Sequence, residues 1–224
     1  MFRNQLIKTL NLETPIDIDK EIFFINLNKS KKYFLEWFEY SKNDKFFEFL
    51  EYSSVKKKNE FNLFVKELIK TESNYKNFNY QKFWLIINEK NELVGTAKLT
   101  NIHPVRKSVE WGFGINPKLW GTNYVSRIQL SLLNYVFNKL NFHRLYGTTQ
   151  VNNFKVIKSV QLFGFKKEGI KRDYYFNTKN HTYYDAYSYA LLKNDFKKNN
   201  SVKNIFFKKE NRIKNFKLLL NLFI

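Results

Sequence analysis

Hydrophobic residues recur along this chain with two periods, one close to two residues and one close to 3.6, and these periods predict its elements. Alternating or short continuous apolar runs predict strands over residues 21–27, 83–87, 93–100, 108–115, 143–151, 165–177 and 181–192. Helical spacing predicts helices over 31–52, 59–72 and 122–140, and from 153 to a terminating glycine at 164. Turns at 88–92 and 178–180 join two pairs of strands into hairpins. The pattern predicts one α+β domain over residues 21–196.

The two ends of the chain lack this pattern. Residues 1–20 are polar, and we expect an N-terminal arm with no signal peptide. Residues 197–224 form a basic extension whose apolar end, LLLNLFI, is too short to span a bilayer. One interpretation of the extension is a solvated segment, or a last helix that packs on the domain. The other is a helix that binds RNA or a membrane surface. We expect a cytoplasmic protein with no transmembrane segment.

Composition limits the chemistry. Aromatic residues make up 19% of the 224 residues, enough apolar surface for a folded core. The lack of cysteine excludes disulfides and thiolate metal sites, and His103, His143 and His181 lack the spacing of zinc ligands, so no metal is expected. The net charge of +19 favours anionic ligands such as nucleotides, nucleic acid, the ribosome or acidic membranes. An AT-rich genome would produce the same excess of lysine and asparagine, so both origins of the charge stay open.

The strand 109–115 carries the first candidate for catalysis. Its alternation places four apolar residues on one face and Glu110, Gly112 and Gly114 on the other. A carboxylate beside aromatic side chains and two positions without side chains suits a general base with room for a ligand. The alternative is a solvent-exposed glutamate next to two glycines.

The turn 117–124 carries the second candidate. Successive amides at a helix N-terminus favour a phosphate, and Gly121 lets the backbone approach an anion closely. Thr122 or Asn123 would equally serve as an ordinary N-cap.

Three blocks of the chain together resemble a known family. They are VEWGFGINPKLWGTNYVS at 109–126, NNFKVIKSVQLFGFKKEG at 152–169, and RDYY with YYDAYSYALL within 172–192. The first resembles the run E-x-G-aromatic-x-I-x-P-x-x-W-G-x-G, and the second the run N-x-x-S…G-F-x-x-E-G. These runs are typical of GNAT N-acetyltransferases, in the branch that includes the ribosomal-protein N-terminal acetyltransferases. The resemblance covers about residues 21–196 and implies the GNAT fold, a central mixed, mostly antiparallel, twisted sheet that is flanked by helices and splayed at the cofactor cleft.

The resemblance also implies roles for single residues. Glu110 falls at the position of the general base. Lys118, Gly121 and Asn123 fall in the pyrophosphate loop Q/R-x-x-G-x-G/A, the last where the family has glycine or alanine. Asn153 matches the asparagine beside the pantetheine arm. The implied acetyl-CoA-binding residues are Phe113, Gly114, Ile115, Lys118, Trp120, Gly121, Thr122, Asn123, Tyr124, Val125, Asn153 and Val156.

Val156 departs from the branch, which commonly has a serine there that protonates the departing thiolate. Valine has no proton to donate, so the resemblance leaves this role to water or to the hydroxyl of Tyr174 or Tyr175.

The implied function is direct transfer of an acetyl group from acetyl-CoA, a co-substrate, to a primary amine, with Glu110 as base and no metal. The acceptor is a protein N-terminus, an amino sugar carried on a nucleotide, or a small polyamine or antibiotic. Positive charge favours the ribosome or another acidic carrier over free polyamines. The protein is expected to be a monomer or homodimer. The alternative is a catalytically impaired GNAT-fold module that binds RNA or a protein partner through its basic surface, which Asn123 and Val156 favour.

Overall fold

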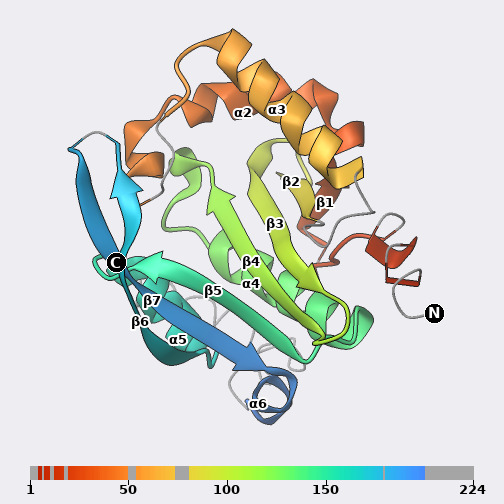
Figure 1. The fold of residues 1–224 in the computed structure, drawn as a ribbon. Helices are drawn as coiled ribbons and strands as arrows, with labels where there is room; N and C mark the ends of the chain where they lie inside the picture. The colour runs from red at the N-terminus through yellow and green to blue at the C-terminus, as the bar shows by residue number, and fades with distance from the viewer. Residues whose placement is uncertain are drawn as a thin grey trace.

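The chain folds around a seven-stranded sheet (Figure 1). The structure is a computed structural model that describes residues 5–6, 8–10, 13–17, 20–49, 54–73, 81–178 and 180–199. The strand order is β1-β2-β3-β4-β5-β7-β6, and every neighbouring pair is antiparallel except β4 and β5. The strands are β1 Ile22–Asn26, β2 Lys82–Asn88, β3 Leu93–His103, β4 Ser108–Ile115, β5 Arg144–Gln150, β6 Lys166–Asn177 and β7 Thr182–Leu192. The predicted strands and the mixed, mostly antiparallel sheet of the GNAT fold are therefore confirmed.

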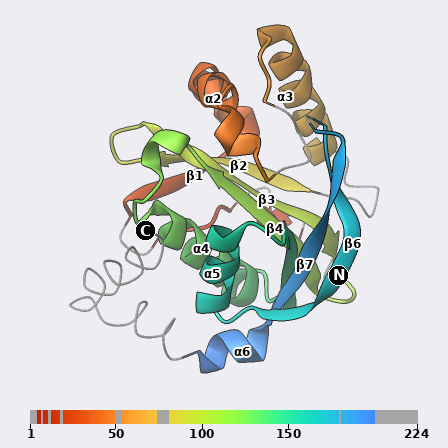
Figure 2. The same ribbon diagram turned by 90° about the vertical axis from the view of Figure 1, so that its left-hand side faces the viewer.

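Helices cover both faces of the sheet, with α2 and α3 on one face and α4 and α5 on the other (Figure 2). They are α2 Phe34–Ser41, α3 Lys58–Ser73, α4 Tyr124–Asn134, α5 Phe154–Leu162 and α6 Lys193–Lys198. The helix predicted over 31–52 is shorter than expected, because 3-10 turns at 31–33 and 44–47 flank α2. The glycine predicted to end α5 does so: Gly164 has φ +87°, and Phe165 N donates to Val160 O at 3.0 Å, as in a Schellman motif.

Strand β2 separates two clusters of the hydrophobic core. Trp84 and Ile86 belong to the cluster that includes α4 and α5, whereas Phe83, Leu85 and Ile87 belong to the cluster of α2 and α3. Because helices cover both faces, all of β2 is buried. This explains why its sequence is a continuous apolar run rather than an alternating one.

Residues 1–20, expected to form an arm, do not stand apart from the domain where the structure describes them. Leu6 and Leu10 are buried in the same cluster as α4. The carboxylate of Asp17 forms a buried ion pair with Arg127 of α4, 3.2 Å from Nη1. The basic extension expected over 197–224 lies outside the described residues beyond Asn199.

The parallel strands β4 and β5 pair at three positions and then separate. The last of these pairs is Glu110 with Tyr146. Beyond it β4 continues beside β3 to Ile115, and β5 continues beside β7 to Gln150, with no pairing between β4 and β5 among the described residues. The expected splay is present, and because both strands end on this side, the helices that follow them, α4 and α5, begin there (Figure 1).

Candidate active site

Glu110 stands at the point where β4 and β5 separate. Its Oε2 accepts a hydrogen bond of 2.6 Å from Nδ2 of Asn101 and a longer one of 3.5 Å from Oγ1 of Thr100. Asn101 occupies an irregularity in the β3–β4 pairing, with φ +48°, a conformation that asparagine tolerates better than most residues. The half-buried carboxylate is therefore held in a fixed orientation while still facing outward from the strand.

Tyr146 is a neighbour of Glu110 that the sequence did not indicate. The two residues are register partners on parallel strands, so their side chains share one face of the sheet. Burial and then the charge of Glu110 raise the pKa of Tyr146 above its usual range. The phenol consequently stays protonated and available as a hydrogen-bond donor at neutral pH.

Of the two tyrosines expected near the reacting atoms, Tyr175 lies over β5. Its hydroxyl is 2.9 Å from Oγ1 of Thr148 and donates to the Thr148 carbonyl oxygen at 3.3 Å. Tyr174 packs edge to face against Tyr175, with ring centroids 5.1 Å apart, and is 42% exposed. Tyr174 also contributes to the raised pKa of Tyr146, so both tyrosines lie near the separation of β4 and β5.

The apolar face of β4 is as predicted, since Val109, Trp111 and Ile115 are buried and Phe113 packs against the same cluster. The opposite face differs from the expectation of open space over the glycines. A Cβ atom on Gly112 would lie 3.0 Å from Cε of Lys98, and one on Gly114 would lie 2.6 Å from Cζ of Phe46. Neighbouring side chains, rather than free volume, cover these two positions.

The turn before α4 has the form expected of an anion-binding site. Gly121 has φ +79°, and a Cβ added to it would meet nothing within 4 Å, so the turn is open to a ligand. Among the described residues, the backbone amides of Gly121 and of residues 123–126 donate to no protein acceptor. Together with the helix dipole, these amides favour a phosphate.

The residues around this turn are fixed by local hydrogen bonds. Asn116 Oδ1 accepts from Lys118 N at 3.2 Å, and Trp120 Nε1 donates to Ile115 O at 3.1 Å. The hydroxyl of Thr122 donates back to Leu119 O at 2.7 Å and does not cap the helix.

Asn123 occupies the N-cap position but forms no side-chain cap. Its φ of −73° and ψ of −3° are right-handed, so this position does not require glycine. The departure from the family's G/A at 123 therefore introduces no backbone strain. Tyr124 and Val125, the first residues of α4, are half-buried against the core.

At the start of α5, Asn153 is the N-cap. Its Oδ1 accepts a hydrogen bond of 3.3 Å from Val156 N. The Val156 side chain packs against the hydrophobic cluster beneath the sheet. The structure thus gives both residues a structural role at the helix start, which lies beside the separated ends of β4 and β5.

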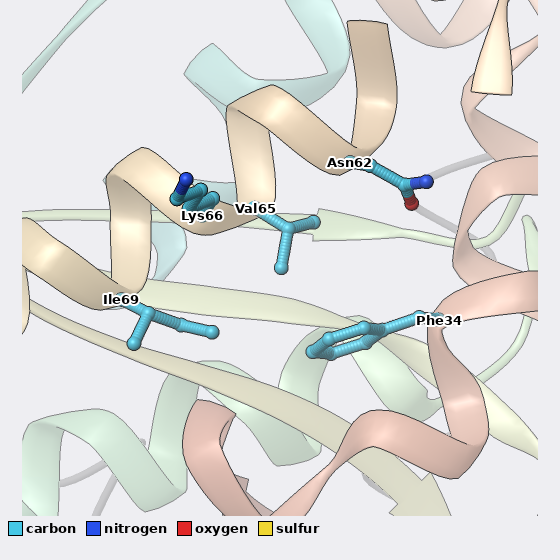
Figure 3. A pocket seen from close by; sticks show the side chains of 5 residues that line it. All are labelled: Phe34, Asn62, Val65, Lys66 and Ile69. Atoms are coloured by element: carbon cyan, nitrogen blue, oxygen red, sulfur yellow. The ribbon is translucent and has the colours of Figure 1, made fainter. Parts of the chain in front are cut away.

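A pocket of about 240 Å³ lies elsewhere, between α2 and α3 (Figure 3). The residues that line it are Phe34, Asn62, Val65, Lys66 and Ile69. None of them comes from β4, β5 or the turn before α4, so this pocket is separate from the candidate site. Within the described residues, no cluster of histidine, cysteine or carboxylate groups could hold a metal ion, and no helix is long and apolar enough to cross a membrane.

Comparison with known proteins adds the family. Residues 25–166 match the family model of the acetyltransferase (GNAT) domain. The chain belongs to the GNAT acetyltransferase family. The family assignment accounts for the mixed, splayed sheet and its flanking helices.

Relatives agree with this assignment. The uncharacterized N-acetyltransferase p20 of Bacillus licheniformis is 29% identical over 115 residues, which are 51% of this chain and 64% of p20, less than two thirds of its length. The uncharacterized N-acetyltransferase YnaD of Bacillus subtilis is 25% identical over 174 residues, 75% of this chain and 97% of YnaD. A crystal structure of spermidine N-acetyltransferase from Vibrio cholerae, in complex with CoA and spermine, has a TM-score of 0.67 at 19% identity and covers 79% of this chain and 98% of that one. At that identity the likeness concerns the fold.

Proposed function

We propose that this GNAT domain transfers an acetyl group from acetyl-CoA to a primary amine, with Glu110 as the general base. The observation that carries the proposal is the place of Glu110. Its carboxylate, oriented by Asn101, lies at the last paired position before β4 and β5 separate. A base must be held within reach of the proton that it removes, and a fixed carboxylate at the opening between two strands meets this requirement.

The residues near this opening fit acetyl-CoA. The amides of Gly121 and of residues 123–126 offer successive donors to a pyrophosphate, and the missing side chain at Gly121 keeps the approach open. The backbone edge of β4 from Trp111 to Ile115 has no partner in β5 and would hold the amide groups of the pantetheine arm. When bound, acetyl-CoA supplies the activated acetyl thioester.

Glu110 and two nearby tyrosines have separate roles in the proposed reaction. Glu110 accepts the proton of the acceptor ammonium, directly or through water, and leaves the free amine. The hydroxyl oxygen of Tyr146, opposite Glu110 in the strand pairing, accepts a hydrogen bond from an N–H of the bound amine and so helps to position it. The hydroxyl of Tyr175, held by Thr148, takes the role of proton donor to the thiolate that Val156 cannot fill.

The acceptor is a primary amine on a protein N-terminus, an amino sugar or another small molecule. The resemblance to the ribosomal-protein N-terminal acetyltransferases favours the first, with the ribosome or another acidic carrier as a partner for a chain of net charge +19. The spermidine N-acetyltransferase of Vibrio cholerae favours a small amine instead.

The test uses Glu110→Gln, which keeps the shape of the side chain and removes its basicity. We expect turnover at neutral pH to fall about 10²–10⁴-fold, as loss of a general base does, and the acid limb of the pH–rate profile to disappear. Calorimetry should find CoA affinity unchanged, because Glu110 lies on the acceptor side. Unaltered turnover would make Glu110 structural, and absence of CoA binding by the unaltered protein would favour a binding module that lacks catalysis.

A further inference from the structure

Lys98, an exposed lysine on the same face of the sheet as Glu110, has no carboxylate partner among the described residues. Lys98 is on β3, and its register partner on β4 is Gly112, two residues along the same face from Glu110. The aliphatic part of its side chain lies over Gly112, where a Cβ atom would come within 3.0 Å of Cε and 3.4 Å of Cγ. Among the described residues, no carboxylate forms an ion pair or hydrogen bond with the Lys98 ammonium.

The other groups on this face do not offset that charge. Phe46 covers the next glycine, Gly114, and Thr96 Oγ1 is 3.6 Å from the position of a Cβ there, so both neighbours beyond Lys98 are uncharged. On the other side of Glu110, the positive charges of Arg144 and Arg106 both act on Tyr146. Arg144 is paired with Glu168, but no carboxylate in the described chain pairs with Arg106. Among the described residues, Lys98 and Arg106 therefore lie on either side of Glu110 without a carboxylate partner of their own.

We propose that Lys98 binds an anionic group of the acceptor, so that the acceptor is a primary amine that also carries a carboxylate or phosphate. This inference rests on the proposed function, because it takes the amine to be bound at Glu110. Gly112 lies two residues, about 7 Å, along β4 from Glu110, so the Lys98 side chain that covers Gly112 is within reach of an acceptor whose amine is at Glu110. A free ammonium with a stem ordered against the strand gives such an anion a charge-assisted hydrogen bond.

The same arrangement disfavours polyamines. A polyamine bound with one nitrogen at Glu110 has its further ammonium groups within the field of Lys98, where like charges repel. This separates the chain from the Vibrio cholerae spermidine N-acetyltransferase, which shares its fold. The acceptor preference follows from one residue pair, Lys98 with Gly112, rather than from the overall charge.

The experiment measures kcat/KM by thiol release for the full chain with saturating acetyl-CoA and matched pairs of acceptors. Glucosamine 6-phosphate against glucosamine tests phosphate, and a peptide that begins with aspartate against one that begins with asparagine tests carboxylate. Spermidine is the fifth acceptor. We expect the anionic member of at least one pair to be preferred about tenfold, mainly through KM, as one charge-assisted hydrogen bond allows. The pair that shows the preference identifies the anion.

Substitutions assign the preference to Lys98. Lys98→Met should bring the ratio of anionic to neutral acceptor close to one, and Lys98→Arg should keep most of it. Lys90→Met, on the β2–β3 turn, is the matched control and should leave the ratio unchanged. A ratio that survives in Lys98→Met, or spermidine as the best acceptor of the unaltered protein, overturns the inference and leaves the proposed function in place. Failure to acetylate any of the five acceptors, with CoA bound, counts against the proposed function and therefore against both.

Discussion

Tyr174 and Tyr175 are adjacent in sequence but differ in what holds them. The Tyr175 hydroxyl is tied to Thr148 on β5, which lies past the point where β4 and β5 separate, whereas the Tyr174 side chain is 42% exposed. A hydroxyl that must give up a proton at a defined place needs such a fixed partner. We therefore expect Tyr175 rather than Tyr174 to be the proton donor, and Tyr174 serves as its control.

We predict that Tyr175→Phe lowers turnover roughly tenfold while Tyr174→Phe changes it less than twofold. The expected loss is smaller than that for a general base, because thiols ionise with a pKa of about 8.5 and a thiolate leaves readily. Steady-state kinetics with both variants makes the comparison, and a melting curve for each checks that folding is retained. Full activity in both variants, relative to the unaltered protein, would mean that the thiolate leaves without help from either tyrosine.

At the scale of single elements, we expect the turn into α4 to set the affinity for CoA. Gly121 has φ +79° and open space beside it, so a side chain there strains the backbone without a clash. We predict that Gly121→Val weakens CoA binding by roughly 1–3 kcal/mol, because the strained turn no longer presents its amides together. Calorimetry with CoA measures this. As a control, Gly169→Val changes a β6 glycine without positive φ or nearby atoms, and should leave affinity unchanged.

Elements with a strong local pattern were predictable from the sequence, and contacts between distant elements were not. The alternation on β4 correctly separated Glu110 from Trp111, and Gly164 correctly marked the end of α5. Tyr146 was missed because its place beside Glu110 depends on a parallel pairing between strands that are separated by a helix. The place of Lys98 over Gly112 depends on the register of the β3–β4 hairpin, which the hydrophobic pattern does not define. The conformation of Asn123, which removes the objection to a residue larger than glycine, is likewise visible only in three dimensions.

At the scale of the whole molecule, contacts of the N-terminal segment before β1 hold it against α4, the helix that follows the turn at 117–124. Arg127, in the first turns of α4, is 5% exposed and pairs with Asp17 at 3.2 Å and with Glu21 at 2.7 Å. The backbone amide of Glu21 also donates to Asp17 Oδ2 at 3.0 Å. Two leucines in a polar segment, Leu6 and Leu10, do not make a pattern that predicts burial. The contact between the N-terminal segment and α4 could therefore not be inferred from the sequence.

We predict that Asp17→Ala destabilises the protein by about 2–4 kcal/mol. Removing one partner from a buried ion pair leaves the other charge uncompensated, and here Glu21 retains part of the compensation for Arg127. Glu13→Ala is the matched control from the same segment. It breaks the pair between Glu13 and Lys139, whose side chains are 41% and 55% exposed, and should cost less than about 1 kcal/mol. Urea denaturation measures both losses. If Asp17→Ala costs no more than Glu13→Ala, the buried pair does not hold the N-terminal segment, and its attachment must come from other contacts, such as the burial of Leu6 and Leu10 and the hydrogen bond from the Tyr135 hydroxyl to the Glu13 carbonyl.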